Sequence, residues 1–309
     1  MIEEKTSVDE IMRQAYRQGI LIPAFNVAYI PMIEPIIESL KKHRTFGLVE
    51  VARPDVEKFG AGSFKKVAER YYALGERIFT RLHLDHVPVI DEDGKKVDWE
   101  YLIKLGLELK FDSVMIDGSR LTLKENISAT RKVVELAHNC DVPVEAELGA
   151  VFGHEDGPIP PYEELFATKK GFTAIGEAER FVKETGVDWL SVAIGNVHGA
   201  ISGVAKDEKK ISARLDVEYL KKMVEVTKIP LVLHGGSGIE RSSMMQAIQN
   251  GISKINIGTS IRQAHEFSLR SHPDDIIIAQ AKVAQEMERF IKEYELEGSW
   301  DILGKNISE

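Results

Sequence analysis

Eight short apolar runs alternate with longer amphipathic segments along all 309 residues of the chain. The runs read as buried parallel strands, and the segments between them have the spacing of helices. Strands are predicted at 20–27, 46–51, 77–84, 113–116, 143–148, 189–194, 230–233 and 254–257. Helices are predicted at 8–17, 30–42, 63–74, 99–107, 123–138, 174–185, 216–226, 241–249 and beyond 262. This order predicts an α/β fold of one domain, the (β/α)8 TIM barrel, with the first helix closing its bottom.

Charge and composition exclude several classes of function. A net charge of −9 argues against nucleic-acid and anionic-membrane partners, which attract basic proteins. The sequence has neither a signal-peptide pattern nor an apolar run of about 18 residues. The single cysteine, Cys140, rules out an internal disulfide, and its position after a helical pattern predicts a packed thiol. We therefore expect a cytoplasmic protein that acts on a small molecule.

Three histidines, His86, His198 and His234, stand at the ends of predicted strands. The carboxyl ends of barrel strands meet at one rim, where active sites of such barrels lie. Three imidazoles with an open fourth position are typical of a catalytic zinc site. Nearby His83 is expected to pack or to support the ligands. The sequence therefore predicts a bound metal that takes part in chemistry.

Other polar residues stand at the same strand ends, and they offer further ligands or hydrogen-bonding groups: Asn26, Asp85, Asp117, Glu147 and Asn256. Asp117, which is followed by Gly118 and Ser119, would also suit a plain helix cap. Two glycine-rich turns, 235–238 and 258–260, follow the last two strands. Small residues let backbone N–H groups approach an anion, so a phosphate site is predicted there.

The connection 149–173 is unusually long for a compact domain. It holds several glycines and prolines around His154, Glu155 and Asp156. Loops of this length are often functional, and we predict an active-site lid, with a passive insertion as the alternative.

Together these segments resemble the class II, metal-dependent ketose-bisphosphate aldolases, the family of fructose-bisphosphate and tagatose-bisphosphate aldolases. The matching segments run in the family's order: 24–27, 82–86, 113–119, 144–149, 155–157, 196–199, 233–238 and 254–256. The resemblance covers nearly the whole chain. It implies aldol cleavage or condensation with dihydroxyacetone phosphate as one half of the substrate. It also implies a homodimer or homotetramer.

The resemblance assigns a role to individual residues. The zinc ligands would be His86, His198 and His234, with Glu147 and Asp117 offering an alternative, more exposed metal position. Asp85 would exchange a proton with the hydroxyl at the new carbon–carbon bond, and Glu155 would move the proton at the nucleophilic carbon. Substrate and phosphate would contact Asn26, Gly199, Gly235, Gly236, Ser237, Asn256, Gly258 and Thr259. A monovalent cation would lie near Val197, Gly199, Gly235 and Ser237.

Four positions depart from the family pattern: Ala52, Arg120, His154 and Gly258. They leave the dihydroxyacetone phosphate half intact and alter the half that receives the acceptor aldehyde. We expect glyceraldehyde 3-phosphate or a variant of it as acceptor, and for a phosphorylated acceptor Arg53 or Arg120 would replace the lost phosphate contact. The alternative is an aldolase for a ketose 1-phosphate, which lacks the distal phosphate.

Three other functions remain open at this point. A Schiff-base aldolase would use Lys254, although Glu50 and Glu145 are candidate partners that would keep this lysine charged. A zinc hydrolase would use the same three histidines to activate water. A barrel without activity would only bind a ligand. Removal of the metal by a chelator separates these readings, because the Schiff-base enzyme alone keeps its activity.

Overall fold

The barrel is closed and entirely parallel in the computed structural model, which describes residues 6–149, 162–196, 213–235 and 239–305. Each strand pairs with the next in the sequence, and β8 pairs with β1. The strands are β1 Ile22–Asn26, β2 Gly47–Val51, β3 Thr80–Pro88, β4 Ser113–Asp117, β5 Val144–Leu148, β6 Trp189–Val192, β7 Leu231–Leu233 and β8 Ile252–Ile257. The predicted (β/α)8 fold is confirmed.

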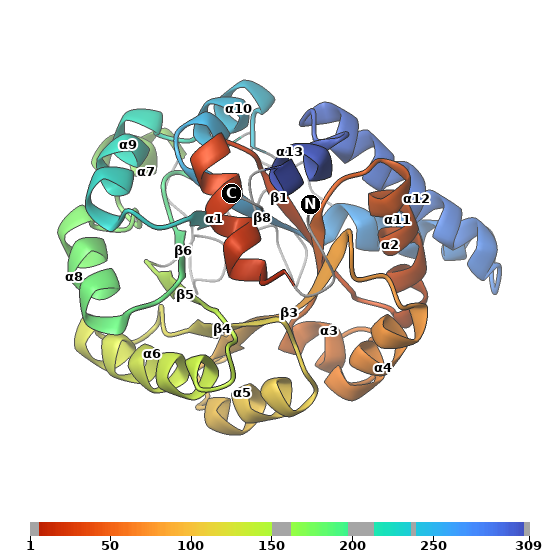
Figure 1. The fold of residues 1–309 in the computed structure, drawn as a ribbon, viewed down its shortest axis with the longest axis horizontal. Helices are drawn as coiled ribbons and strands as arrows, with labels where there is room; N and C mark the ends of the chain where they lie inside the picture. Colours follow the sequence, from red (N-terminus) through yellow and green to blue (C-terminus); the bar gives the residue numbers. More distant parts are fainter. Residues whose placement is uncertain (1–5, 150–161, 197–212, 236–238, 306–309) are drawn as a thin grey trace.

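Helices form a ring outside the strands (Figure 1). They are α2 Ile33–Lys42, α3 Arg53–Glu57, α4 Phe64–Leu74, α5 Trp99–Glu108, α6 Leu123–His138, α7 Tyr162–Thr168, α8 Ile175–Thr185, α9 Val217–Thr227, α10 Arg241–Gln249, α11 Thr259–Ser271 and α12 Ile276–Glu293. A 3-10 turn, η1 Ile30–Met32, precedes α2. Two short helices, α3 and α7, were not predicted, because five and seven residues are too few to show helical periodicity. Among the described helices, none is long and apolar enough to cross a membrane.

The first helix, α1 Val8–Gln18, lies across one end of the barrel, beside α13 Ser299–Lys305 (Figure 1). Its start is fixed by a capping box, in which Ser7 accepts from the backbone N–H of Glu10 and Glu10 accepts from that of Ser7. Its apolar face packs on residues near the amino ends of the strands, including Ile22 and Trp189. The helix therefore closes the bottom of the barrel, as predicted.

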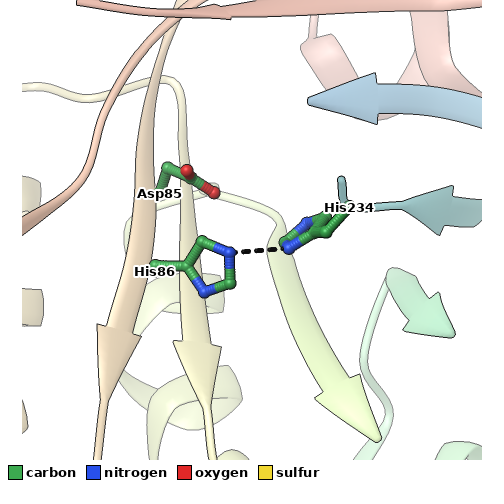
Figure 2. A group of neighbouring side chains, drawn as sticks. All are labelled: Asp85, His86 and His234. Carbon is green, nitrogen blue, oxygen red and sulfur yellow. Dashed lines mark hydrogen bonds between the residues drawn. The ribbon is translucent and has the colours of Figure 1, made fainter. Parts of the chain in front are cut away.

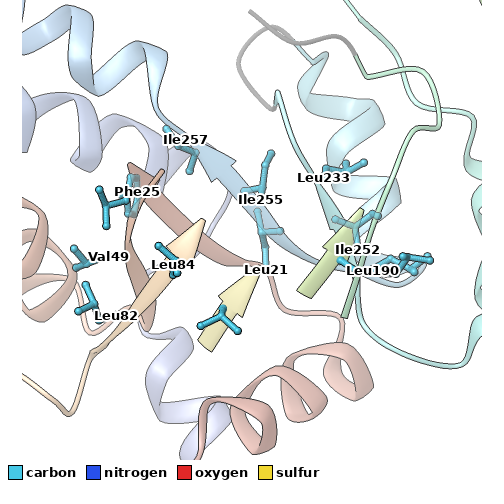
Figure 3. Close-up of a cluster of buried hydrophobic side chains, with 14 of the residues drawn as sticks. Leu21, Phe25, Val49, Leu82, Leu84, Leu190, Leu233, Ile252, Ile255 and Ile257 are labelled. Atoms are coloured by element: carbon cyan, nitrogen blue, oxygen red, sulfur yellow. The ribbon is translucent and has the colours of Figure 1, made fainter. Parts of the chain in front are cut away.

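Apolar side chains fill the space between the strands and the helical ring. Residues such as Phe25, Val49, Leu84 and Ile257 belong to this layer, part of which Figure 3 shows. Burying one such side chain stabilises the fold by about 1.5–3 kcal/mol. The expectation of a packed thiol was wrong: Cys140 is exposed, because it lies in the turn after α6 and outside this layer.

The interior of the barrel changes character along its axis. Its lower part is apolar and includes Leu48 and Val232. Alternate residues higher on the strands are fully buried polar groups, among them Glu50, His83 and Lys254. Because buried charges persist only when they are paired, these residues form a connected network that supports the upper rim.

Candidate metal and catalytic site

An irregularity in β3 brings Asp85 and His86 to the same site. Successive residues of a regular strand point to opposite faces. Here the register with β4 shifts between Leu84 and Val87, and His86 has a φ of 35°, in the left-handed region. Such a bulge redirects a side chain, and Figure 2 shows the ring of His86 turned toward His234. The strand was predicted to end at Leu84, but it continues past the histidine to Pro88.

One ring nitrogen of His86 points at one ring nitrogen of His234, with the two ring planes 69° apart. Nε2 of His86 lies 2.7 Å from Nδ1 of His234 (Figure 2). The opposite nitrogens meet carboxylates: Nε2 of His234 lies 2.8 Å from Oε1 of Glu145, and Nδ1 of His86 lies 3.4 Å from Oδ2 of Asp117. A carboxylate that holds one ring N–H directs the lone pair of the other nitrogen outward. The arrangement thus aims two lone pairs at one point, which suits a shared proton or a metal cation.

Carboxylates complete a set of metal-binding groups around this pair. Ligand atoms of Asp85, His86 and His234 lie within 4.8 Å of one another, as do those of His86, Asp117 and Glu147. Among the described residues, Oε2 of Glu147 has no hydrogen-bond partner although it is buried, and it lies 3.3 Å from Nδ1 of His234. Imidazole nitrogens with carboxylate oxygens suit a divalent ion such as zinc. The residues present therefore fit a metal, and His86 belongs to both groups.

Both histidines bind protons more tightly than an ordinary imidazole does. Burial disfavours the charged ring, but the negative charge of Asp85 outweighs it and raises the pKa of His86 to about 9. Burial is likewise outweighed at His234, where Glu145 and Glu147 raise the pKa to about 10. A metal must displace these protons, so its binding is favoured by rising pH.

Two asparagine amides hold the carboxylate of Asp85. Nδ2 of Asn26 donates to Oδ2 at 2.9 Å, and Nδ2 of Asn256 donates to Oδ1 at 2.9 Å. Burial would raise the pKa of Asp85, but the positive charges of His86 and His234 keep it below its ordinary value. Asp85 is therefore an ionised, oriented proton acceptor beside the histidine pair.

Lys254 anchors this arrangement from below. Its Nζ lies 2.9 Å from Oε2 of Glu145 and 3.4 Å from Oε2 of Glu50, and it donates to Oδ1 of Asn256 at 2.5 Å. Burial opposes the charged form, but Glu145 and Glu50 raise the pKa of Lys254 above its ordinary value. A lysine held charged is a poor nucleophile, which argues against the Schiff-base reading. The bond to Asn256 also fixes which end of that amide faces Asp85.

His83 is packed beneath the site, as expected. It is fully buried, with Nδ1 2.8 Å from Oγ of Ser113 and Nε2 3.6 Å from Oε2 of Glu145. Burial, with the positive charge of Lys254, lowers the pKa of His83 to about 3. The ring is therefore neutral at physiological pH and acts as an uncharged neighbour of Glu145.

Some contributing residues were not assigned a role from the sequence. Nδ2 of Asn196 donates to the backbone oxygen of His234 at 3.0 Å, and its Oδ1 accepts from the backbone N–H of Ile194 at 2.9 Å. This buried amide ties the ends of β6 and β7 together and holds His234 in place. The sequence feature that could have pointed to Asn196 is its position two residues before His198. Glu145 was considered only as a partner of Lys254, and its contact with His234 required the fold.

Arg53, one of the two arginines expected to replace the lost phosphate contact, lies at the end of β2 and is paired with carboxylates of the protein. Nη1 and Nη2 of Arg53 each lie 3.1 Å from Oδ2 of Asp91, and its Nε donates to Glu57 at 2.6 Å. This guanidinium is thus already bound, whereas Arg120 is exposed after β4. Asp55, on the unpredicted helix α3, is buried and accepts from the backbone N–H of Ala52 at 2.8 Å.

The phosphate-binding residues are described only in part. Thr259 begins α11 directly after Gly258, as the phosphate prediction required. A Cβ on Gly258 would lie 3.2 Å from Oδ1 of Asn26, so the glycine leaves room for that amide. The predicted positions that lie outside the described residues are Glu155, Val197, His198, Gly199, Gly236 and Ser237. The roles of these residues stay predictions. The lid also stays a prediction, and the part of it that the structure describes includes α7.

The chain matches one known family in sequence, and it resembles known aldolases in sequence or in fold. The sequence model of class II fructose-bisphosphate aldolase matches residues 6–299. A 6-phospho-5-dehydro-2-deoxy-D-gluconate aldolase of Bacillus licheniformis is 34% identical over 269 residues, which are 86% of this chain and 82% of the relative. The YdjI aldolase of Escherichia coli K12 superposes with a TM-score of 0.76 at 25% identity, covering 95% of this chain and 98% of that one. The fructose-bisphosphate aldolase of Campylobacter jejuni superposes with a TM-score of 0.72 at 20% identity, covering 95% and 96%.

Proposed function

Because the chain belongs to the class II fructose-bisphosphate aldolase family and is an aldolase, we propose that it cleaves a phosphorylated keto sugar in a metal-dependent reaction. The products are dihydroxyacetone phosphate and an aldehyde, and the reverse reaction joins them. The observation that carries this proposal is the carboxylate of Asp85, which accepts from two amides beside the adjacent rings of His86 and His234.

The residues of the chain divide the work of the reaction. Asp85 removes the proton from the hydroxyl group on the acceptor side of the breaking bond, and returns it in the condensation direction. Asn26 and Asn256 hold this carboxylate in one orientation. Glu155, which lies outside the described residues, is proposed to move the proton at the nucleophilic carbon.

The metal is proposed to be zinc, held by His86, His198 and His234. Glu147 and Asp117 would provide an alternative position that shares His86. When bound, the ion supplies Lewis-acid stabilisation of the negative charge that develops on the substrate oxygens. Glu145 and Asp117 support this role by orienting the two described rings. A monovalent cation near Val197, Gly199, Gly235 and Ser237 is proposed from the family resemblance alone.

Substrate identity rests on the acceptor half. The expected acceptor is glyceraldehyde 3-phosphate or a variant of it, and the alternative is that the enzyme cleaves a ketose 1-phosphate, whose acceptor half has no phosphate. The Bacillus licheniformis relative supports a second candidate, because its name specifies 6-phospho-5-dehydro-2-deoxy-D-gluconate. That sugar acid carries a carboxylate at the end away from its phosphate. We further propose a cytoplasmic homodimer or homotetramer.

The proposal is tested by release of dihydroxyacetone phosphate. The substrates are fructose and tagatose 1,6-bisphosphates, fructose 1-phosphate and 6-phospho-5-dehydro-2-deoxy-D-gluconate. Activity that disappears after EDTA treatment and returns with zinc supports the metal-dependent reaction. Activity that survives EDTA, but is lost when borohydride is added with substrate, would assign the reaction to Lys254. Hydrolysis of a phosphate ester without release of dihydroxyacetone phosphate would favour a zinc hydrolase.

A further inference from the structure

Asp55 places a negative charge at the end of β2, beside the proposed reaction centre. The residue lies on α3 and is 7% exposed. We propose that Asp55 is a specificity-determining residue: it favours an acceptor aldehyde with an uncharged, hydroxylated end and disfavours one that carries a phosphate or carboxylate. This inference rests on the proposed aldolase function. Of the substrates considered there, it favours the alternative, a ketose 1-phosphate, over the bisphosphate and over the sugar acid phosphate.

A single amide connects Asp55 to the acid/base residue. Nδ2 of Asn26 lies 2.9 Å from Oδ2 of Asp85 and 3.5 Å from Oδ2 of Asp55. Asp85 handles the proton of the hydroxyl on the acceptor side, so the acceptor must reach this side of the site. The glycine turns predicted to bind the other phosphate follow β7 and β8, whereas Asp55 follows β2. The acceptor end therefore extends from Asp85 toward Asp55.

The groups after β2 that would attract a substrate anion are already paired with carboxylates of the protein. Asp55 accepts from the backbone N–H of Ala52, one of the four positions that depart from the family pattern. Arg53 is bound to Asp91 and Glu57. A phosphate arriving here would therefore meet a carboxylate in place of a backbone donor.

A second arginine on this side is paired as well. Nη1 of Arg262 lies 2.8 Å from both Oε1 and Oε2 of Glu266, on the same face of α11. Its positive charge also favours the ionised form of Asp55. Arg262 thus has two carboxylates of the protein itself within its electrostatic reach, which weakens its attraction for an anion on the substrate.

The ionisation of Asp55 sets the conditions for a test. Burial raises its pKa to about 7, while the Ala52 N–H, the Asn26 amide and Arg262 oppose the rise and the charge of Asp85 adds to it. Above this pH the carboxylate is charged and accepts hydrogen bonds only. It then repels a phosphate and accepts from a hydroxyl, and a juxtaposition of like charges is costly in a buried site. We expect discrimination of about tenfold or more.

Fructose 1-phosphate and fructose 1,6-bisphosphate test this directly, because they differ only in the distal phosphate. The measurement is kcat/KM for each substrate at pH 8 with the metal-loaded enzyme. We expect the wild type to favour the monophosphate by about tenfold or more. Asp55→Asn should reduce this preference by about tenfold, because its amide oxygen still accepts from Ala52 while the charge is gone. Glu69→Gln removes an exposed carboxylate from the neighbouring helix α4 and should leave the ratio unchanged.

The sugar acid phosphate provides an independent arm. The wild type should have a lower kcat/KM for 6-phospho-5-dehydro-2-deoxy-D-gluconate than for fructose 1-phosphate, and Asp55→Asn should raise the kcat/KM for the sugar acid phosphate. A wild type that prefers an anionic acceptor end, or a ratio that Asp55→Asn leaves unchanged, overturns the inference while the aldolase function stands.

Equilibrium binding keeps the inference testable if turnover fails. Isothermal titration of the metal-loaded protein with the two fructose phosphates should show the same preference, and Asp55→Asn should reduce it. Absence of dihydroxyacetone phosphate release would count against the proposed function. Equal binding of the two fructose phosphates by the wild type would count against Asp55. Circular dichroism checks that Asp55→Asn is folded. If the variant does not fold, the preference of the wild type between the two fructose phosphates decides whether the inference holds.

Discussion

Oε1 of Glu145 lies 2.8 Å from Nε2 of His234, on the side of the ring opposite His86. In the neutral ring that metal binding requires, this contact places the N–H of His234 on Nε2 and its lone pair on Nδ1. Both residues are fully buried. Asn196 holds the backbone of His234, and the ring is oriented from this side by the Glu145 carboxylate. That carboxylate in turn depends on Lys254, which lies 2.9 Å from its other oxygen.

Replacement of Glu145 by glutamine should weaken metal binding. The amide oxygen still fits beside His234, but it is a weaker acceptor than a carboxylate and makes the ring less basic. Loss of such a supporting contact typically costs 10- to 100-fold in metal affinity, and we expect a decrease in that range. Competition with a fluorescent chelator measures it. Glu177→Gln, at an exposed position on α8, is the control; equal affinities in the two variants would refute the assignment.

Replacement of Lys254 by methionine should destabilise the fold. It leaves Glu50 and Glu145 buried without their shared cation, and removing one partner of a buried ion pair costs about 3–5 kcal/mol. Urea denaturation gives the change in the free energy of unfolding. Lys292→Met removes an exposed pair with Glu288 and should cost less than about 1 kcal/mol. Similar losses in the two variants would show that the buried network contributes little.

Replacement of Asn26 by alanine should lower kcat more than it changes KM or metal content. Asp85 would lose one of its two amide donors, while the histidine pair would keep its contacts. Misplacement of a reacting group by about 1 Å can cost about 100-fold in rate, and we expect a decrease of about 10- to 100-fold. Steady-state kinetics and metal analysis of the same preparation separate the two effects. An unchanged kcat would show that Asn256 alone suffices.

The folded state should become less stable as pH decreases, because His83 is buried and neutral. Its pKa is about 3 in the folded protein, against about 6.5 in an unfolded chain. Between these values the unfolded state binds more protons, so the free energy of unfolding decreases as pH falls. The effect is about 1.4 kcal/mol per pH unit, or about 2 kcal/mol from pH 6.5 to 5.

Denaturation of the apoprotein at both pH values tests this expectation. Between pH 6.5 and 5, the free energy of unfolding of His83→Gln should decrease by about 2 kcal/mol less than that of the wild type. This difference does not depend on how stable the variant is at pH 6.5. His272→Gln provides a control, since His272 is exposed at the end of α11. A pH dependence identical in wild type and His83→Gln would show that His83 is not responsible.

Sequence periodicity predicted the barrel because helices and parallel strands leave different apolar patterns. All eight strands and the long helices were found, and α6 and α10 matched to the residue. The polar residues at the strand ends were also identifiable, since parallel strands carry their carboxyl ends to one rim. Asn26, Asp85, Asp117, Glu147, His234 and Asn256 do gather there.

The sequence by itself therefore determined the fold class and the composition of the rim. Only the tertiary structure decided how these groups face one another. The turn of His86 toward His234 depends on a bulge in β3, and the position of Asp55 depends on a helix too short to show a period. The contacts of Glu145 with His234 and Lys254 join residues from three strands. Such contacts arise from barrel closure and strand register, which local residue patterns do not encode.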